Sequence, residues 1–278
     1  MQGQRAIKVG NFEIANNKPI TLIAGPCQME SREHALKMAM DIKDIAKKNA
    51  VNFIFKTSFD KANRTSIDGK RGIGLEASLS IFKEIKEKVG CPLLTDVHLE
   101  NQCMILSEVI DVLQIPAFLC RQTDLLVAAA KTGKVINIKK GQFLAPWDVI
   151  NITKKMIASG NDQLLLTERG VSFGYNTLIN DMRGLEIMKK TGFPVVFDAT
   201  HSTQQPGGQG NQSGGQREFI KPLARAATAV GVAAVFVETH ENPDIAPSDG
   251  ACMLPLNKLD QLIQEIMAFD RISKKYIE

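Results

Sequence analysis

The chain has 278 residues, of which 44% are hydrophobic and 23% are charged, as is typical of one soluble domain spanning residues 1–278. Its 34 basic and 30 acidic residues give a net charge of only +4, too balanced to predict a nucleic-acid partner. No apolar run reaches the roughly 18 residues of a membrane span, and residues 1–10 are polar. We therefore expect a cytoplasmic protein with no membrane partner.

Residues 6–19 are predicted to form a hairpin, because two short apolar segments, 7–9 and 12–14, flank a turn at Gly10-Asn11. Eight apolar segments then alternate with segments of helical periodicity. We expect strands over residues 20–24, 51–55, 92–95, 111–113, 135–138, 163–167, 194–197 and 234–237. We expect helices over residues 31–48, 75–89, 99–108, 122–132, 147–159, 177–191, 217–230 and 255–270.

Each expected strand ends on a polar or charged residue, or in the case of residues 20–24 runs into Cys27. Continuous apolar strands indicate a parallel sheet that is buried on both faces. Functional residues at the carboxyl ends of the strands are typical of a (β/α)8 TIM barrel. A doubly wound open sheet is the main alternative, but it would not normally use eight such units. The sequence therefore predicts a barrel whose amino-terminal end is closed by the hairpin.

Three long segments without periodicity follow the second, seventh and eighth strands, over residues 57–74, 202–216 and 239–252. Loops of this length in a compact domain tend to be functional, and these are expected at the catalytic end. Residues 208–210 (Gly-Gln-Gly) weakly match a dinucleotide-binding loop, but they follow the wrong strand and lack the third glycine. We expect no nucleotide cofactor.

Four potential metal ligands follow strands that are neighbours in a closed barrel: Cys27, His201, Glu238 and Asp249. One thiolate, one imidazole and two carboxylates suit zinc, iron or manganese better than magnesium. The five cysteines include no Cys-x-x-Cys pair, so in a reducing compartment we expect thiols or a metal ligand. In the alternative interpretation, Cys27 is only a buried thiol and His201 binds only substrate.

Four cations, Lys56, Lys61, Lys139 and Arg169, follow the second, fifth and sixth strands. Such a group predicts binding of phosphate or carboxylate. Residues 63–66 (Asn-Arg-Thr-Ser) and Arg121 offer further anion sites, so two phosphorylated substrates are expected. A Schiff-base aldolase using Lys139 and a non-catalytic sugar-phosphate-binding barrel are the alternatives.

Long motifs of the chain resemble those of the 3-deoxy-D-manno-octulosonate 8-phosphate synthases, over about residues 18–270. They lie at residues 25–31 (GPCQMES), 55–64 (FKTSFDKANR), 114–124, 137–143, 167–170, 198–202 and 238–240. The resemblance implies condensation of phosphoenolpyruvate with arabinose 5-phosphate and water. The products would be the eight-carbon sugar acid phosphate, used in the inner core of lipopolysaccharide, and inorganic phosphate.

The resemblance also implies roles for individual residues. Phosphoenolpyruvate would be held by Lys56, Lys61, Lys139 and Arg169. Arabinose 5-phosphate would be held by Asn63, Arg64, Thr65 and, from a neighbouring subunit of a homotetramer, Arg121. Catalytic roles are implied for Lys56, Asp96, His98 and His201, and substrate contacts for Ser58, Gln114 and Phe118.

This family has metal-dependent and metal-independent branches, with cysteine or asparagine at the position of Cys27. Cys27, His201, Glu238 and Asp249 therefore imply the metal-dependent branch. The seven-carbon synthases that act on erythrose 4-phosphate are the alternative. They have a Lys-Pro-Arg-Thr type of sequence where this chain has Lys-Ala-Asn-Arg at residues 61–64.

Overall fold

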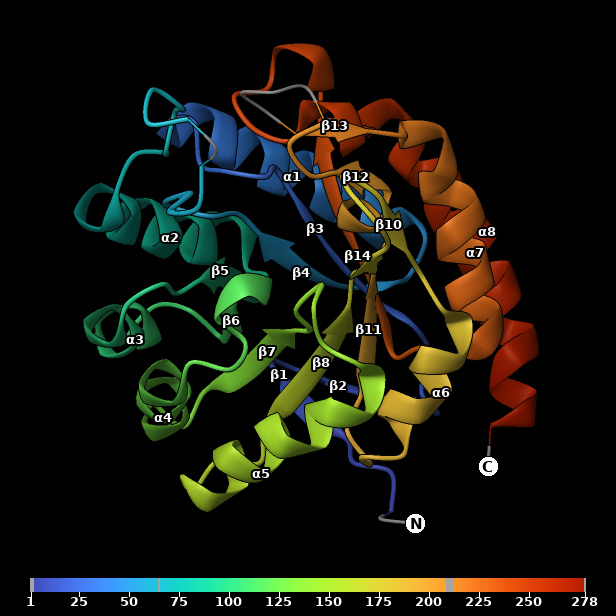
Figure 1. Ribbon diagram of the computed structural model, residues 1–278. Helices are drawn as coiled ribbons and strands as arrows, with labels where there is room; N and C mark the ends of the chain where they lie inside the picture. The colour runs from blue at the N-terminus through green and yellow to red at the C-terminus, as the bar shows by residue number, and fades with distance from the viewer. Residues whose placement is uncertain (1–2, 65, 209–212, 278) are drawn as a thin grey trace.

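The computed structural model describes residues 3–64, 66–208 and 213–277. In this part of the chain, eight parallel strands form the closed barrel that the sequence predicts (Figure 1). Closure comes from β14, which pairs with both the first and the seventh barrel strand. The barrel strands are β3 (Thr21–Gly25), β4 (Asn52–Lys56), β5 (Leu93–Asp96), β6 (Val112–Ile115), β7 (Val135–Lys139), β8 (Leu164–Glu168), β11 (Val195–Asp198) and β14 (Ala234–His240).

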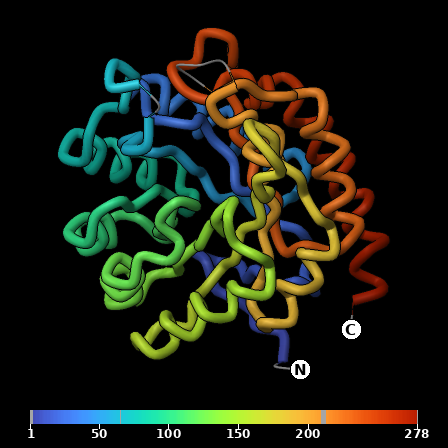
Figure 2. The backbone as a smooth tube through the Cα atoms, in the orientation of Figure 1, coloured from blue at the N-terminus to red at the C-terminus, as the bar shows by residue number. Residues whose placement is uncertain are grey.

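Helices surround the barrel and cover its outer face (Figure 2). Ser31 caps the first of them by accepting a hydrogen bond from the His34 N–H at 3.1 Å, as its place before the apolar periodicity predicts. The helices are α1 (Arg32–Lys48), α2 (Leu75–Val89), α3 (Glu100–Ser107), α4 (Thr123–Lys131), α5 (Val149–Ala158), α6 (Met182–Lys189), α7 (Ile220–Val230) and α8 (Leu259–Ser273).

The predicted hairpin is present as β1 (Ile7–Val9) and β2 (Phe12–Ile14). Its apolar side chains form one buried cluster with inward-facing residues of the barrel strands, among them Ile23, Leu94 and Phe236. The barrel interior is therefore filled with side chains and covered by the hairpin at its amino-terminal end. This leaves the carboxyl-terminal end for the site.

The strands extend beyond the ranges that the sequence predicts. The polar residue at the strand end still pairs with its neighbour, as Lys139 does with Thr167 and Asp198 with Phe236. In β14 this extension reaches His240, and the added strand β15 (Leu254–Pro255) pairs with it. Backbone pairing therefore holds Lys56, Lys139, Asp198 and Glu238 on rigid strand ends.

The predicted helix over residues 177–191 is wrong at its start. Residues before Met182 instead form a two-stranded hairpin, β9 (Val171–Ser172) with β10 (Leu178–Ile179). Asp181 then caps α6 by accepting a hydrogen bond from the Arg183 N–H at 3.0 Å. A capping aspartate inside the apolar pattern is the signal that the periodicity alone misses.

The loop expected over residues 202–216 also contains structure. Its described parts form the pair β12 (Gln204–Gln205) and β13 (Gly214–Gly215). Gln209 and Gly210 of the weak dinucleotide match lie outside the described residues, as does Thr65. Among the described helices, none is long and apolar enough to cross a membrane. The five cysteines are free thiols and all are buried.

Candidate active site

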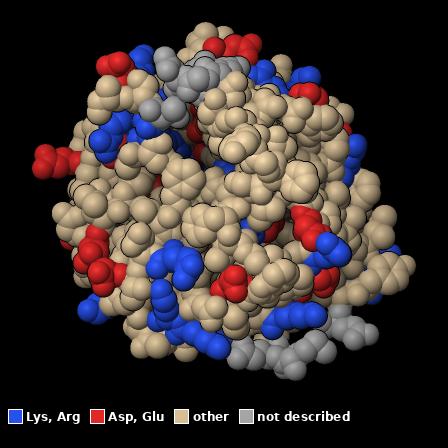
Figure 3. Space-filling view, viewed as in Figure 1, with Lys and Arg blue, Asp and Glu red and all other residues tan. Residues whose placement is uncertain are grey.

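A cavity of about 550 Å³ opens at the carboxyl ends of the barrel strands. Figure 3 shows this face as largely uncharged, with acidic and basic atoms recessed near its upper edge. Many of the predicted site residues line the cavity: Lys56, Lys61, Asn63, Arg64, Asp96, His98, Gln114, Phe118, Lys139, Arg169, His201, Glu238 and Asp249. The parallel strands bring them together because all their carboxyl ends share one edge of the closed sheet.

Two predicted substrate-binding residues, Ser58 and Arg121, do not line this cavity. Ser58 is buried beneath the cavity, where its hydroxyl donates to Asp96. Arg121 is exposed and lines a separate hollow of about 160 Å³ with Asp148 and Lys155. Thr65 lies outside the described residues.

Cys27, Glu238 and Asp249 bring their potential ligand atoms within 4.8 Å of one another. The Cys27 Sγ donates to the Asp249 Oδ2 at 3.2 Å. Close backbone contact makes this possible, because a Cβ on Gly25 would lie 1.9 Å from the Lys56 carbonyl oxygen. Only glycine allows β3 to end so near β4 and the chain to turn to Cys27.

Asp249 adopts a left-handed backbone with φ of 53°, which is uncommon for a residue other than glycine. The next residue is Gly250, where an added Cβ would lie 2.1 Å from the Pro243 carbonyl oxygen. The surrounding turn therefore imposes the strained conformation of Asp249. Strain of this kind tends to persist at functional sites.

His201 lies beside this group and is oriented by Asp198. The Asp198 Oδ2 is 2.7 Å from the His201 Nδ1, and the His201 Nε2 is 3.6 Å from the Glu238 Oε2. With Asp198 accepting a hydrogen bond from Nδ1–H, Nε2 is left as the free ligand atom, as in carboxylate–histidine–metal arrangements. Burial opposes ionisation of Asp198, but His201 and Lys139 outweigh it and hold its pKa well below the usual range.

The residues around Glu238 fit a divalent cation. One carboxylate oxygen of Glu238, Oε2, is buried without a hydrogen-bond partner among the described residues. Burial, followed by the charge of Glu238, raises the pKa of the Cys27 thiol well above its ordinary value. A thiol and an orphaned carboxylate oxygen at one point are an unfavourable arrangement that a bound cation would relieve.

The acidic groups are ionised despite their burial. Lys56, His201 and Lys61 outweigh desolvation and hold the pKa of Glu238 at about 2. Lys56 and Lys61 likewise hold the pKa of Asp96 well below its usual range. The cavity thus contains oppositely charged side chains at close range.

The four predicted cations are fixed by neighbouring groups. The Lys56 Nζ donates to the Glu238 Oε1 at 2.6 Å, and the Lys139 Nζ donates to the Asp198 Oδ2 at 2.6 Å. Lys61 lies 3.9 Å from the same Glu238 oxygen. Arg169 is buried, and its Nη1 has no partner among the described residues. These cations are preorganised for an anion.

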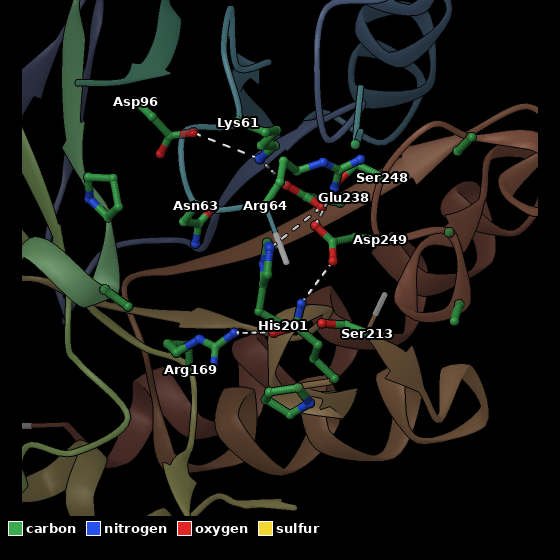
Figure 4. Close-up of a pocket in the computed structure, with 18 of the residues that line it drawn as sticks. Lys61, Asn63, Arg64, Asp96, Arg169, His201, Ser213, Glu238, Ser248 and Asp249 are labelled. Atoms are coloured by element: carbon green, nitrogen blue, oxygen red, sulfur yellow. Dashed lines mark hydrogen bonds and ion pairs between the residues drawn. The ribbon is translucent and has the colours of Figure 1, made fainter. Parts of the chain in front are cut away.

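Near Lys61 and Asp249, Arg64 binds the loop after β14 (Figure 4). Its Nη1 donates to the Ser248 hydroxyl at 2.7 Å, and its Nη2 donates to the Pro247 carbonyl oxygen. Ser248 precedes Asp249, so the loop after β4 and the loop after β14 are joined where the two predicted ligand sites meet. Asn63 lines the cavity beside Arg64.

A buried chain of polar side chains supports the floor of the cavity. The Gln114 Nε2 donates to the Asp96 Oδ1 at 2.5 Å, and the Asn137 Nδ2 donates to the Gln114 Oε1 at 2.8 Å. The Thr167 hydroxyl continues the chain to Asn137 at 2.6 Å. His98 faces the same floor, and burial lowers the pKa of its imidazole, although Asp96 opposes the shift.

Several of these supporting residues were not predicted from the sequence as part of the site. Asp198 and Asn137 carried a usable signal, because they lie in strands that end at the cavity. Gln204 and Ser248 carried none, since they belong to long polar loops. Only the folded loops show that these two side chains contact Arg169, Asp249 and Arg64.

The closed barrel and its group of cations define a (β/α)8-barrel enzyme that handles anionic substrates. The family model described as DAHP synthetase I family matches residues 4–274. The chain belongs to this family and, within it, to the group of 2-dehydro-3-deoxyphosphooctonate aldolases.

Two relatives show the degree of similarity. The 2-dehydro-3-deoxyphosphooctonate aldolase of Chelativorans sp. (strain BNC1) is 64% identical over 268 residues, covering 96% of this chain and 97% of the relative. The protein of the same name from Brucella canis is 61% identical over 268 residues, with the same coverage.

Proposed function

We propose that this chain is a metal-dependent 3-deoxy-D-manno-octulosonate 8-phosphate synthase. It condenses phosphoenolpyruvate with D-arabinose 5-phosphate and water, and it releases inorganic phosphate. The 2-dehydro-3-deoxyphosphooctonate aldolase name of its relatives denotes this enzyme. The observation that carries the proposal is one cavity lined by four cations, an imidazole and two carboxylates, with the Cys27 thiol close to both carboxylates.

Phosphoenolpyruvate binds to Lys56, Lys61, Lys139 and Arg169 in this proposal. Its phosphate and carboxylate need several positive charges, and these side chains are held in a buried site where charge interactions are strong. Arg169 is the best-suited phosphate partner because its Nη1 is unpaired among the described residues and the residue lines the cavity. The planar guanidinium can form two parallel bonds to one anion.

The sugar phosphate binds at the side of the cavity formed by Asn63 and Arg64. In the reaction, the enol carbon of phosphoenolpyruvate forms a bond to the aldehyde carbon of the sugar, and water adds to the adjacent carbon. The two phosphorylated substrates must therefore meet above the floor formed by Asp96 and Gln114. Holding both at reacting distance lowers the barrier by removing the entropic cost of their encounter.

Cys27, His201, Glu238 and Asp249 would hold a divalent transition ion of the zinc, iron or manganese type. When bound, the ion supplies a Lewis acid at the side of the cavity where the aldehyde and water react. The protein's own contribution is orientation. Asp198 fixes the imidazole of His201, and Lys56 holds one oxygen of Glu238 so that the other faces the cluster.

A homotetramer completes each site in this proposal. Arg121 is exposed and is not among the residues that line the cavity of its own subunit, so its guanidinium is available to a neighbouring subunit. Exposed aromatic side chains, Phe118 on the same loop and Phe143 and Trp147 on the loop after β7, provide apolar surface for subunit contacts.

The Schiff-base alternative is disfavoured by the surroundings of Lys139. Its ammonium group pairs with Asp198, whereas a Schiff-base lysine must react as the neutral amine. Incubation with borohydride and arabinose 5-phosphate, which supplies the aldehyde that a Schiff base requires, should therefore leave Lys139 unmodified.

The test of the function is product formation from both substrates. Mass spectrometry should detect the eight-carbon sugar acid phosphate, and phosphate should be released only when both substrates are present. The family description also includes the seven-carbon synthases, so erythrose 4-phosphate is the matched control. Equal turnover of the two sugars would contradict the proposed substrate.

A further inference from the structure

The side chain of Gln204 lies between the two halves of the site. The Arg169 Nη2 donates to the Gln204 Oε1 at 2.8 Å, and the Gln204 Nε2 donates to the Asp249 Oδ1 at 2.8 Å. A guanidinium can only donate and an ionised carboxylate can only accept, so these partners dictate the orientation of the amide. A single side chain thus connects a cation of the substrate site to a carboxylate of the metal cluster.

Both ends of this connection face ligand positions. The Arg169 Nη1 has no hydrogen-bond partner in the described part of the chain, and Arg169 lines the cavity. Asp249 uses its second oxygen, Oδ2, to accept bonds from Cys27 and Ser248, at 3.2 and 3.1 Å. A change in the charge at Arg169 therefore has a direct hydrogen-bonded route to a carboxylate of the metal cluster.

The backbone holds Gln204 at this position. Gln204 pairs with Gly215 in the β12–β13 ladder, and the Gln216 N–H donates to the Thr203 carbonyl oxygen at 2.9 Å. A Cβ on Gly215 would lie 2.8 Å from the backbone of Ala251, so β13 packs tightly on the turn that follows Asp249. The short ladder and the turn of Asp249 therefore form one packed unit.

We propose that Gln204 is a positioning residue that couples phosphoenolpyruvate binding at Arg169 to metal binding at Asp249, each ligand tightening the other. The inference rests on the proposed function, since it requires both ligands to bind. It goes further because it assigns a role to a residue outside both predicted ligand sets.

The direction of the coupling follows from polarisation along the hydrogen-bond chain. With no anion bound, the Arg169 charge polarises the Gln204 amide, and its N–H draws electron density from the Asp249 carboxylate. An anion on Arg169 neutralises that charge, which leaves Asp249 a stronger donor to a cation. Thermodynamic reciprocity then requires that the metal tighten phosphoenolpyruvate by the same factor.

The experiment measures this factor in metal-free protein prepared by chelation. Calorimetry gives the Kd of Zn²⁺ with and without saturating phosphoenolpyruvate, and the Kd of phosphoenolpyruvate with and without Zn²⁺. Gln204→Met removes both bonds at similar volume, and Gln204→Asn keeps the amide on a chain too short to span both partners. Gln205→Met is the control. Gln205 is next to Gln204 in the sequence, but its side chain is not among those that line the cavity.

In the wild type and in Gln205→Met we expect each ligand to lower the Kd of the other at least about fivefold. In both Gln204 variants the factor should fall to near one. Gln204→Asn keeps the test decisive if the methionine variant does not fold.

Two results would overturn the inference in distinguishable ways. If folded Gln204 variants keep the wild-type coupling factor, Gln204 is not the connection, while the metal-dependent function stands. If the wild type binds no Zn²⁺ and is fully active after chelation, the metal assignment and the inference both fail.

Discussion

Cys27 and Asp249 meet because two glycines permit turns that other residues could not make. Gly25 lets β3 end against β4, and Gly250 lets the loop after β14 fold back on Pro243. The burial of Cys27 then raises the pKa of its thiol, which is costly for a metal ligand unless a cation is present. The position of a single side chain thus determines whether this site can hold an ion.

The first prediction concerns Cys27. Cys27→Ala should lose metal and activity together, because one of four ligands is removed. Cys27→Asn mimics the metal-independent branch of the family and should keep measurable turnover in the presence of a chelator. Elemental analysis and activity assays after chelation check both expectations, with Cys103→Ala in α3 as the control thiol. Full wild-type activity without bound metal would reduce Cys27 to a buried thiol.

The second prediction concerns Arg64. Arg64→Ala should raise the KM for arabinose 5-phosphate roughly 10- to 100-fold, the value of lost hydrogen bonds to a charged group. The KM for phosphoenolpyruvate should change much less, because Arg64 is not among the four cations proposed to bind it. Arg71→Ala is the matched control, since Arg71 is an exposed arginine of the same loop that pairs with Asp60. Equal effects on both substrates would argue against this assignment.

At the scale of elements, Lys140 connects the loops that follow β7 and β8. It is buried, and its Nζ donates to the carbonyl oxygens of Gly141 and Leu144, at 3.3 and 3.0 Å. It also lies 3.5 Å from Glu168, whose other oxygen accepts bonds from the backbone N–H groups of Arg169 and Gly170. One ion pair therefore fixes the segment that presents Arg169 to the cavity.

The third prediction follows from that pair. Lys140→Met should lower the free energy of unfolding by about 3–5 kcal/mol, because the buried charge of Glu168 loses its cation. Denaturant titration measures the change. The double variant Lys140→Met, Glu168→Gln should recover part of the loss, since the uncompensated charge is then absent. A single variant as stable as the wild type would show that the pair contributes little.

At the scale of the whole molecule, buried thiols should make the free energy of unfolding fall at alkaline pH. Burial raises the pKa of Cys91 and of Cys103 to about 11 in the folded state. Between their unfolded and folded pKa values the folded chain holds more protons than the unfolded chain, so stability must fall as pH rises. The loss begins near the unfolded value of about 8.5.

The fourth prediction is therefore a fall in the free energy of unfolding between about pH 8.5 and 11. Each thiol contributes up to about 1.4 kcal/mol for every unit of pKa shift. Denaturant titrations at several pH values measure the slope. Cys91→Ala should make the slope shallower although it lowers stability at neutral pH, and an unchanged slope would contradict the assignment.

The fifth prediction concerns assembly. Sedimentation should show a homotetramer, and Arg121→Ala subunits mixed with His201→Ala subunits should regain activity. Mixed tetramers contain sites in which an intact His201 meets an intact Arg121 from a neighbour. Each variant alone supplies the control. An active monomer, or mixtures no more active than their parts, would exclude a shared site.

The sequence by itself determined the barrel and most of the residues that line the cavity at its carboxyl-terminal end. Parallel strands buried on both faces must be continuous apolar runs, and polar residues at their ends must share one edge of the sheet. This logic placed Lys56, Lys139, His201 and Glu238 at one cavity, because each lies on or next to a barrel strand.

Only the tertiary structure decided what lies in the loops and how strand ends are shared. The predicted helix does not begin at residue 177, because Leu178–Ile179 pair in a hairpin and Asp181 caps the helix at Met182. Gln204 was invisible to pattern analysis, because its role comes from long-range contacts with Arg169 and Asp249. Periodicity reports which face of an element is buried, whereas a hydrogen bond between distant loops depends on where the folded backbone brings them.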